Sequence, residues 1–439
     1  MAIPRRHLFA TMGALASVAG ATSACAATPR TELASMTLPQ GKDPAQTAAD
    51  ESFWKSVAQQ YTLTDDFVNL ENGYYGIMPD PVRRAFHNNV DRLNEQNSHL
   101  LRKTYKPESE QIRERIASLV GARTEEIALT QSGTEALQNL ISGYNQLHPG
   151  DSVMYADLDY PDMVDAMDWL RDRRGVEVVP IALPEPATQQ AVLDTYAAAL
   201  RNHPTVKLLL LSHVNNRTGL GTPAREIIAM ARAHGVDVIL DAAHSWGQLD
   251  FTINDLDADF AGFSLHKWIG APLGTGFLYI RRTRLDAIDR TFADESHPET
   301  DIRSRVVSGT RDVAGMLSVP TALDFHQALG STVKQARLRY LRDRWVSAVA
   351  DRTDIQILTP QEPSMYGAIT SFRIAGRTSK EDNEAIAKYL FDKHRIFTVA
   401  REGPARGSCV RVTPALFTTL DHVDRFGSAL RETADRFRT

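Results

Sequence analysis

The sequence predicts an α/β protein: a mostly parallel sheet in a large first part, followed by a smaller C-terminal α+β unit. Apolar strand-like runs alternate with helical segments from residue 125 to residue 282, as crossover connections in a parallel sheet require. Near Gly309 this alternation stops, and two long helical segments come before short strands. A chain of 439 residues with 43% hydrophobic content is long enough for two domains.

In the large part, each strand-like run is apolar enough for a sheet covered on both faces. Strands are predicted at 125–131, 151–157, 177–183, 206–214, 236–244, 258–265 and 274–282. Helices are predicted between them at 133–146, 160–175, 189–202 and 223–235. We expect a ligand at the carboxyl ends of these strands, where such sheets bind their ligands.

The C-terminal part predicts a small antiparallel sheet with helices. Helices are predicted at 313–330, 332–352, 379–394 and 420–437, and strands at 368–376, 396–402 and 409–417. The predicted division is a signal peptide at 1–26, a polar linker at 27–50, an N-terminal segment at 51–80, a large domain at 81–314 and a small domain at 315–439.

The first residues have the features of a twin-arginine export signal. Arg5 and Arg6 precede a short, glycine-interrupted apolar run and an Ala24-Cys25-Ala26 cleavage site. The run is too short for a permanent membrane span. We expect export by the twin-arginine machinery and a periplasmic mature protein from about Ala27 without a membrane anchor, with lipoprotein processing at Cys25 as the alternative.

The composition excludes some partners. A formal net charge of −5 provides no basic field for nucleic acid. Removal of the signal leaves Cys409 as the one cysteine, so no internal disulfide is predicted. No metal site is predicted.

One lysine stands out in "FSLHKWIGAPLGTGF", residues 263–277. Lys267 follows a buried strand-like run and precedes a glycine-rich turn, although an arbitrary lysine is usually a solvated surface residue. A lysine in a low-dielectric setting has a lowered pKa and a nucleophilic amine. Such a lysine can condense with a carbonyl group.

Other polar residues follow neighbouring strands. "TQSGTEALQNL" puts Ser132, Gly133 and Thr134 at a helix N-terminus, which binds phosphate but also matches an ordinary capping box. Asp241 and His244 follow the strand "VILD", and Asn216 follows the strand before it. Turn and cap roles are the plainer interpretation of each alone.

Together these stretches resemble the class V group of fold-type I pyridoxal-phosphate enzymes, which includes cysteine desulfurases and isopenicillin N epimerase. The run "LDAAHSWGQLDFTINDLDADFAGFSLHKWIGAPLGTGFLYI" is similar to that family's Asp-x-x-His and Ser-x-His-Lys segments. "FVNLENGYYGIMPDPV" is similar to its N-terminal active-site loop. The resemblance spans residues 67–426 and is nearest to the isopenicillin N epimerase-like branch; with the export signal, it also resembles periplasmic enzymes that tailor pyoverdine.

The resemblance implies pyridoxal 5′-phosphate as cofactor, held covalently by Lys267. Asp241 pairs with the ring nitrogen and keeps it protonated, so that the ring can accept electrons from the α-carbon. His244 and Asn216 approach the phenolic oxygen, and Tyr160 stacks on the ring. Ser264 and His266 are expected to hold the phosphate together with Ser132, Gly133 and Thr134.

The same resemblance implies a substrate site and a dimer. "CVRVTPALF" points to Arg411 as the partner of the substrate carboxylate, with Arg401 and Arg406 as competitors. Asn72 and Tyr74 of the N-terminal loop are expected near the substrate. "VVSGTRD" resembles the segment whose threonine reaches the phosphate of the partner subunit, so Thr310 predicts a homodimer.

The predicted function is chemistry at the α-carbon of an amino-acid or peptide-like substrate, such as a siderophore precursor. Transamination needs the fewest extra groups and ranks first. Epimerisation needs a second acid, for which Tyr74, Tyr75 and His99 are candidates. Carbon–sulfur lyase chemistry is a further alternative, but a desulfurase needs a mobile cysteine and Cys409 lies in a predicted strand. A binding protein that retains only the fold is the alternative outside enzymes.

Overall fold

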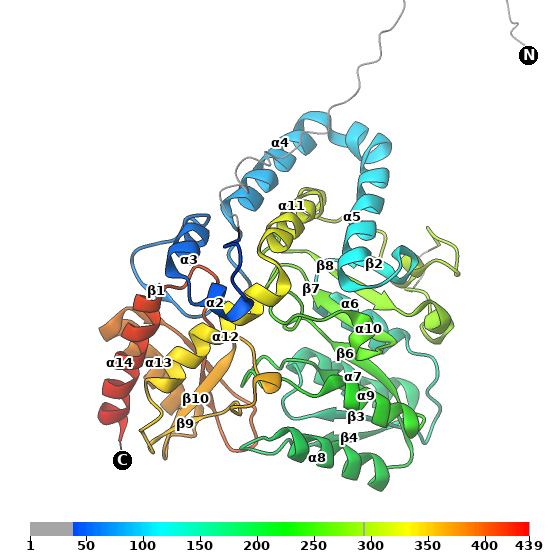
Figure 1. Ribbon diagram of the computed structural model, residues 1–439. Coiled ribbons are helices and arrows are strands. Elements are labelled where there is room, and N and C mark those ends of the chain that lie inside the picture. Colours follow the sequence, from blue (N-terminus) through cyan, green and yellow to red (C-terminus); the bar gives the residue numbers. More distant parts are fainter. Residues whose placement is uncertain (1–37, 293–294, 439) are drawn as a thin grey trace, which may run out of the picture.

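The computed structural model describes residues 38–292 and 295–438, so the predicted export signal and Cys25 lie outside the described residues. A large sheet with its helices and a small sheet with its helices lie beside each other, and helices α4 and α5 extend from the large part (Figure 1). In the described part of the chain, no helix is long and apolar enough to cross a membrane.

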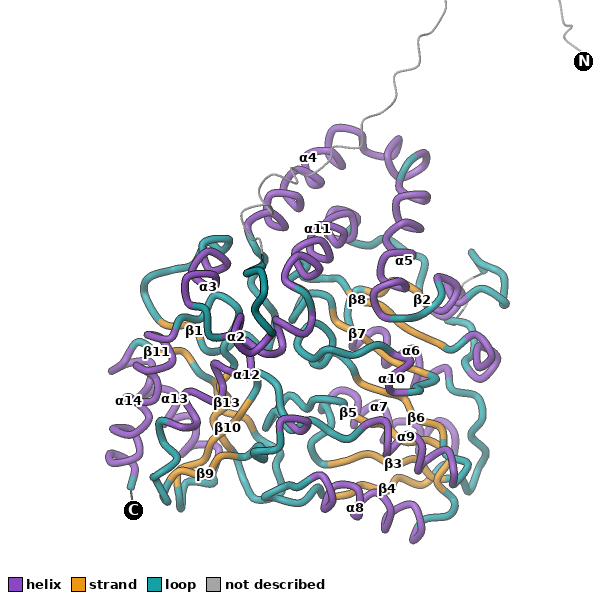
Figure 2. The backbone as a smooth tube through the Cα atoms, viewed as in Figure 1, coloured by secondary structure: helices purple, strands orange, loops and turns teal. Residues whose placement is uncertain are grey.

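The large sheet has seven strands in the order β2-β8-β7-β6-β5-β3-β4, which confirms the predicted fold class (Figure 2). Strand β8 runs antiparallel to both neighbours, and the other pairs are parallel. The strands are β2 (Ile127–Thr130), β3 (Ser152–Ala156), β4 (Glu177–Ile181), β5 (Val206–Ser212), β6 (Asp237–Asp241), β7 (Phe260–Ser264) and β8 (Gly276–Ile280).

Helices bury both faces of this sheet. Leu209 and Leu211 of β5 point into one core, and Leu208 and Leu210 point into the other, because successive strand residues face opposite sides. Helices α5 (Tyr105–Val120), α8 (Gln189–Asn202), α9 (Ala224–Ala233) and α11 (Val313–Leu329) pack on the first face, and α6 (Gly133–Gly143) and α7 (Pro161–Arg174) pack on the second. The short helix α10 (Ile253–Leu256) and the long α4 (Asp80–Lys103) complete this part.

Local chemistry fixes where these helices begin and end. Ser132 accepts a hydrogen bond from the N–H of Glu135, 3.1 Å away, and so caps α6. Pro161 occupies the first turn of α7, and Gly175 ends that helix with φ 67°. The strand-to-helix junctions therefore hold the polar residues in fixed positions.

The small sheet is antiparallel, in the order β12-β13-β10-β9. Its strands are β9 (Ile355–Ile357), β10 (Thr370–Ile374), β12 (Val399–Arg401) and β13 (Cys409–Val412), covered by α12 (Ser331–Ser347), α13 (Lys380–His394) and α14 (Leu420–Phe437). Strand β1 (Val68–Asn69) pairs in parallel with β11 (Ile396–Phe397), so the N-terminal segment packs on the C-terminal unit.

The predicted linker at 27–50 differs from the structure at its end. Residues 44–48 form α2 (Pro44–Ala48), because Asp43 caps its first turn and Pro44 supplies a helical φ. The carbonyl of Ala48 accepts a hydrogen bond from Arg337 of α12, 2.9 Å away. Helix α3 (Glu51–Ala58) follows and buries Trp54, so this end of the stretch is packed. The other domain boundaries stay predictions.

Candidate active site

A cavity of about 360 Å³ lies where the carboxyl ends of β5, β6 and β7 meet the start of α6 and the small sheet. Most of the predicted site residues line it, although they come from separate parts of the chain. The predicted residues in its wall are Tyr74, Tyr75, Ser132, Gly133, Thr134, Tyr160, Asn216, Asp241, His244, Ser264, His266, Lys267, Arg401 and Arg411.

Lys267 follows β7 and turns its amine toward His244. Its Nζ lies 3.1 Å from His244 Nε2, and the indole N–H of Trp268 donates to His244 Nδ1 over 3.4 Å. Burial lowers the pKa of Lys267 to about 8, while Asp241 opposes that shift. Burial and the charge of Lys267 hold the pKa of His244 well below its usual range, so this imidazole is neutral.

Asp241 is the last residue of β6 and is 8% exposed. Its Oδ1 accepts a hydrogen bond from the N–H of Ala243 at 2.9 Å, which fixes the carboxylate at the cavity wall. Burial raises the pKa of Asp241, whereas the charge of Lys267 lowers it. A buried carboxylate of this kind stabilises a positive charge brought into the cavity.

One end of the cavity suits a phosphate group. Helix α6 begins there, where the positive end of the helix dipole favours an anion, and the N–H of Gly133 donates to Ser264 Oγ at 3.1 Å. A Cβ on Gly133 would lie 2.8 Å from that oxygen, so a larger residue would fill the cradle. Burial lowers the pKa of His266 to about 4, and its Nδ1 donates to the carbonyl of Thr275 at 3.0 Å.

The buried side-chain oxygen of Asn216 also fits a bound group. Asn216 follows β5 and lines the cavity, and its Oδ1 has no hydrogen-bond partner among the described residues. An unpaired buried acceptor is costly unless a ligand satisfies it. A bound group that offers a hydroxyl or N–H hydrogen would satisfy this acceptor.

The loop at 70–76 closes the cavity from the N-terminal side. The N–H of Gly76 donates to the carbonyl of His266 at 2.8 Å, and a Cβ there would lie 2.1 Å from the carbonyl oxygen of Lys267. A Cβ on Gly73 would lie 2.8 Å from Cζ of Arg411. Both positions therefore require glycine, because neighbouring atoms leave no room for a Cβ.

Glu71 of this loop holds Arg411. Arg411 Nε donates to Glu71 Oε2 at 3.3 Å, Nη2 donates to Oε1, and Nη1 donates to the carbonyl of Asn216 at 2.6 Å. No sequence motif marks Glu71, and its contact with Arg411 joins residues that are 340 positions apart.

Four predicted residues do not line the large cavity. Arg406 is exposed, which leaves Arg401 and Arg411 as the cavity arginines, and His99 is exposed on α4. Asn72 is buried, donates to the carbonyl of Thr413 at 2.8 Å and lines a neighbouring cavity of about 40 Å³.

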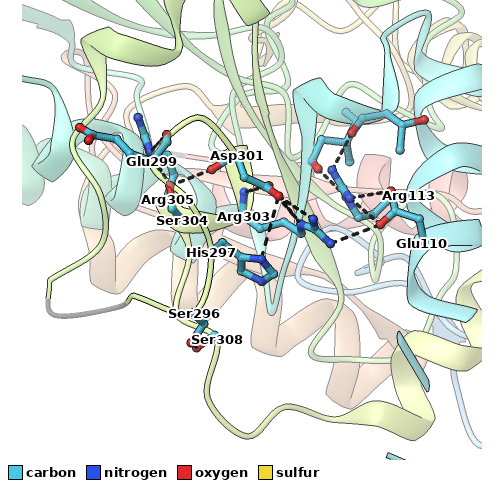
Figure 3. A network of polar contacts seen from close by, with 12 residues as sticks. Glu110, Arg113, Ser296, His297, Glu299, Asp301, Arg303, Ser304, Arg305 and Ser308 are labelled. Carbon is cyan, nitrogen blue, oxygen red and sulfur yellow. Dashed lines mark hydrogen bonds and ion pairs between the residues drawn. The ribbon is translucent and has the colours of Figure 1, made fainter. Parts of the chain in front are cut away.

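Thr310 is exposed, in a segment whose preceding residues are firmly held. Figure 3 shows the network that holds them. Arg303 pairs with Asp301 at 2.5 Å and with Glu110 of α5 at 3.5 Å, and Arg305 donates to the carbonyl of Ile288 at 2.7 Å. Thr310 thus projects outward from an anchored base.

Two further residues bear on the site. Cys409 of β13 is fully buried, and burial raises the pKa of its thiol to about 11, so it is a poor nucleophile. Lys334 of α12 lines the smaller cavity; its Nζ donates to the carbonyl of Trp268 at 2.9 Å and lies 3.0 Å from His326 Nδ1. No sequence motif marks Lys334.

Comparisons with known proteins show the family of this chain. Residues 82–426 match the model of the family described as aminotransferase class-V, whose members depend on pyridoxal phosphate. Isopenicillin N epimerase of Streptomyces clavuligerus is 30% identical over 400 residues, covering 86% of this chain and 97% of that protein.

Solved structures show the same fold. The cysteine desulfurase of Thermococcus onnurineus NA1 superposes with a TM-score of 0.74 at 21% identity, covering 87% of this chain and 98% of that one. A mutant of C-DES with glycine covalently linked to its PLP cofactor has a TM-score of 0.74 at 22% identity, covering 86% of this chain and 98% of that one. With the family match spanning residues 82–426, the chain belongs to the class V aminotransferase family of pyridoxal-phosphate-dependent enzymes.

Proposed function

We propose that this protein binds pyridoxal phosphate and moves a proton at the α-carbon of an amino-acid or peptide-like substrate, with epimerisation as the favoured outcome. The observation that carries the proposal is the cavity in which Lys267, Asp241 and the unpaired Asn216 oxygen converge beside the start of α6. The likeness to isopenicillin N epimerase favours epimerisation over the transamination that the sequence ranked first.

Different residues of the cavity would contact different parts of the cofactor. Lys267 would hold its aldehyde carbon, Asp241 would face its ring nitrogen, and Tyr160 would stack on its ring. Gly133, Thr134, Ser132, Ser264 and His266 would hold its phosphate, and Asn216 would approach its phenolic oxygen, with His244 nearby. When bound, pyridoxal phosphate delocalises the electron pair that remains on the α-carbon after proton loss.

Lys267 is the proposed base. With a pKa of about 8, a substantial share of its amine is neutral near pH 7.5. His244 Nδ1 accepts from Trp268, so a neutral imidazole carries its hydrogen on Nε2 and donates it to the lone pair of Lys267. This hydrogen bond aims the amine and favours its neutral form.

Epimerisation also needs an acid that returns a proton to the opposite face. Tyr74 and Tyr75 line the cavity from the 70–76 loop, on a different element from Lys267. In deuterated water, a true substrate should exchange its α-hydrogen and invert its configuration. Accumulation of pyridoxamine phosphate together with a keto acid would show that the reaction is transamination and not epimerisation.

Asp241→Asn tests the pairing with the ring nitrogen. We expect the cofactor to stay bound through its phosphate contacts, while α-hydrogen exchange slows on the order of a hundredfold or more. Asp172→Asn, at an exposed position in the last turn of α7, is the matched control. Equal exchange rates in wild type and Asp241→Asn would remove Asp241 from the mechanism.

We further propose twin-arginine export, a periplasmic mature protein from about Ala27, a homodimer and a natural-product substrate such as a siderophore precursor. N-terminal sequencing of the periplasmic fraction tests the cleavage site, and retention of Met1 on exported protein would contradict it. A colourless purified protein that gains no visible absorbance with added pyridoxal phosphate would favour the binding-protein alternative.

A further inference from the structure

Glu71 is a buried carboxylate shared by two arginines of the cavity. Its side chain is 7% exposed and binds Arg411 through two nitrogens of the guanidinium group. Its Oε1 also lies 4.0 Å from Nη2 of Arg401 and accepts a hydrogen bond from the N–H of Tyr74 at 3.1 Å. Glu71 is thus held between both cations.

The two arginines retain donors that Glu71 does not occupy. Arg411 uses one hydrogen on each of three nitrogens, so two of its five N–H donors remain. Among the described residues, the buried Nε of Arg401 has no hydrogen-bond partner. Burial and the positive charge of Arg411 lower the pKa of Arg401 to about 10. This cluster has two cations and one anion.

We propose that Glu71 determines specificity by setting this cluster to one net positive charge, so that it accepts a substrate bringing one carboxylate and rejects one bringing two. The inference rests on the proposed function, because it assumes an amino-acid substrate whose carboxylate enters beside Arg401 and Arg411.

Charge balance in a buried site gives the reason. One substrate carboxylate, two guanidinium groups and Glu71 sum to zero charge. A second carboxylate would be buried without a cation, and an unpaired buried charge opposes binding. The pocket therefore selects against dicarboxylic amino acids by a repulsive element, Glu71, as well as by its attractive ones.

A purely structural role for Glu71 makes a different prediction. If Glu71 only orients Arg411, then Glu71→Gln should lower the affinity for all carboxylate ligands by a similar factor, since the amide oxygen still accepts one hydrogen bond. If Glu71 sets the charge, its loss should favour dianions over monoanions. The ratio of the two affinities separates the two roles.

Butyrate and succinate are matched probes, because both have four carbons and they carry one and two carboxylates. Calorimetric titration of the cofactor-loaded protein gives the succinate-to-butyrate affinity ratio. We expect this ratio to rise about tenfold or more in Glu71→Gln, to fall in Arg401→Gln and to return near the wild-type value in the double variant. An unchanged ratio in Glu71→Gln would overturn the proposal.

Two further variants serve as controls for the charge of Glu71. Glu402→Gln removes an acid next to Arg401 in sequence, but Glu402 is exposed and pairs with Lys380 at 2.9 Å, so the ratio should not change. Glu71→Asp keeps the charge and should keep the wild-type ratio; a shift as large as that of Glu71→Gln would contradict the charge argument. If Glu71→Gln does not fold, an unchanged ratio in Arg401→Gln overturns the proposal.

The titration needs no turnover, so its outcome is independent of the proposed reaction. Cofactor absorbance and α-hydrogen exchange test the function, whereas the affinity ratio tests Glu71. If the protein exchanges α-hydrogen but the succinate-to-butyrate affinity ratio is the same in every variant, the proposal for Glu71 is wrong and the proposed function stands.

Discussion

At the scale of single residues, the site depends on the ionisation of one amine. Burial places the pKa of Lys267 at about 8, below the usual 10.5. Covalent capture of pyridoxal phosphate by cofactor-free protein should therefore speed up about tenfold per pH unit below pH 8 and level off above it, because only the neutral amine is nucleophilic.

Borohydride trapping at fixed times, followed by peptide mapping, measures this capture. The label should appear on the peptide containing Lys267. A rate that keeps rising to pH 10 would contradict the lowered pKa of Lys267, and a label on another lysine would contradict its role as the attachment site.

Substitutions at two glycines of the 70–76 loop should affect cofactor retention and carboxylate binding separately. Gly76→Ala puts a Cβ against the backbone of Lys267 and should reduce cofactor retention severalfold. Gly73→Ala presses on Arg411 instead, so it should weaken butyrate binding and leave cofactor absorbance in place. Absorbance and calorimetry on both variants check this difference, and identical defects would mean that the loop acts as one unit.

At the scale of elements, α12 carries a buried lysine without a carboxylate partner among the described residues. Burial lowers the pKa of Lys334 to about 7. The unfolded chain keeps that proton up to about pH 10.5, so between pH 7 and 10.5 the unfolded state binds more protons and stability rises with pH. The slope reaches at most about 1.4 kcal/mol per pH unit.

Lys334→Met removes this titration. From pH 7 to pH 9, the unfolding free energy of the wild type should rise relative to that of the variant, as measured by urea denaturation. The neighbouring His326 is neutral throughout this range, because burial and Lys334 hold its pKa well below its usual range. Lys388→Met, on the exposed face of α13, is the control; parallel curves for Lys334→Met would contradict the shift.

Elements were predictable from the sequence where the signal was local. The alternating apolar runs predicted the strands of the large sheet, and Ser132 marked the start of α6, because periodicity and capping depend on a few neighbouring residues. The contacts of Glu71 and Lys334 escaped prediction, since each depends on tertiary packing between distant segments. The family resemblance, not the local pattern, brought Arg411 into the site.

At the scale of the whole molecule, the exposed segment 307–310 predicts a second copy of the chain. Val307 is 50% exposed although it is apolar, and it follows the anchored residues 301–305 and precedes Thr310 by three positions. Light scattering should give about twice the mass of one mature chain. Val307→Glu should shift the protein toward monomer and weaken cofactor retention, because a buried unpaired charge destabilises an interface.

Trp169→Glu, at an exposed position on α7, serves as the control for added charge. It should leave the mass unchanged. A wild-type protein that is monomeric while fully loaded with cofactor would end the prediction of a shared site.

The pairing of the N-terminal loop with the C-terminal strands has a consequence for the time course of synthesis. The N–H of Asn72 donates to Thr413 Oγ1 at 2.7 Å, and these residues are 341 positions apart. At about 5–20 residues per second, the ribosome needs roughly 17–70 s to make the stretch between them. Throughout that interval the loop that covers Lys267 lacks its partners Arg411 and Thr413. A closed cofactor pocket is therefore a sign that translation of the chain has all but ended.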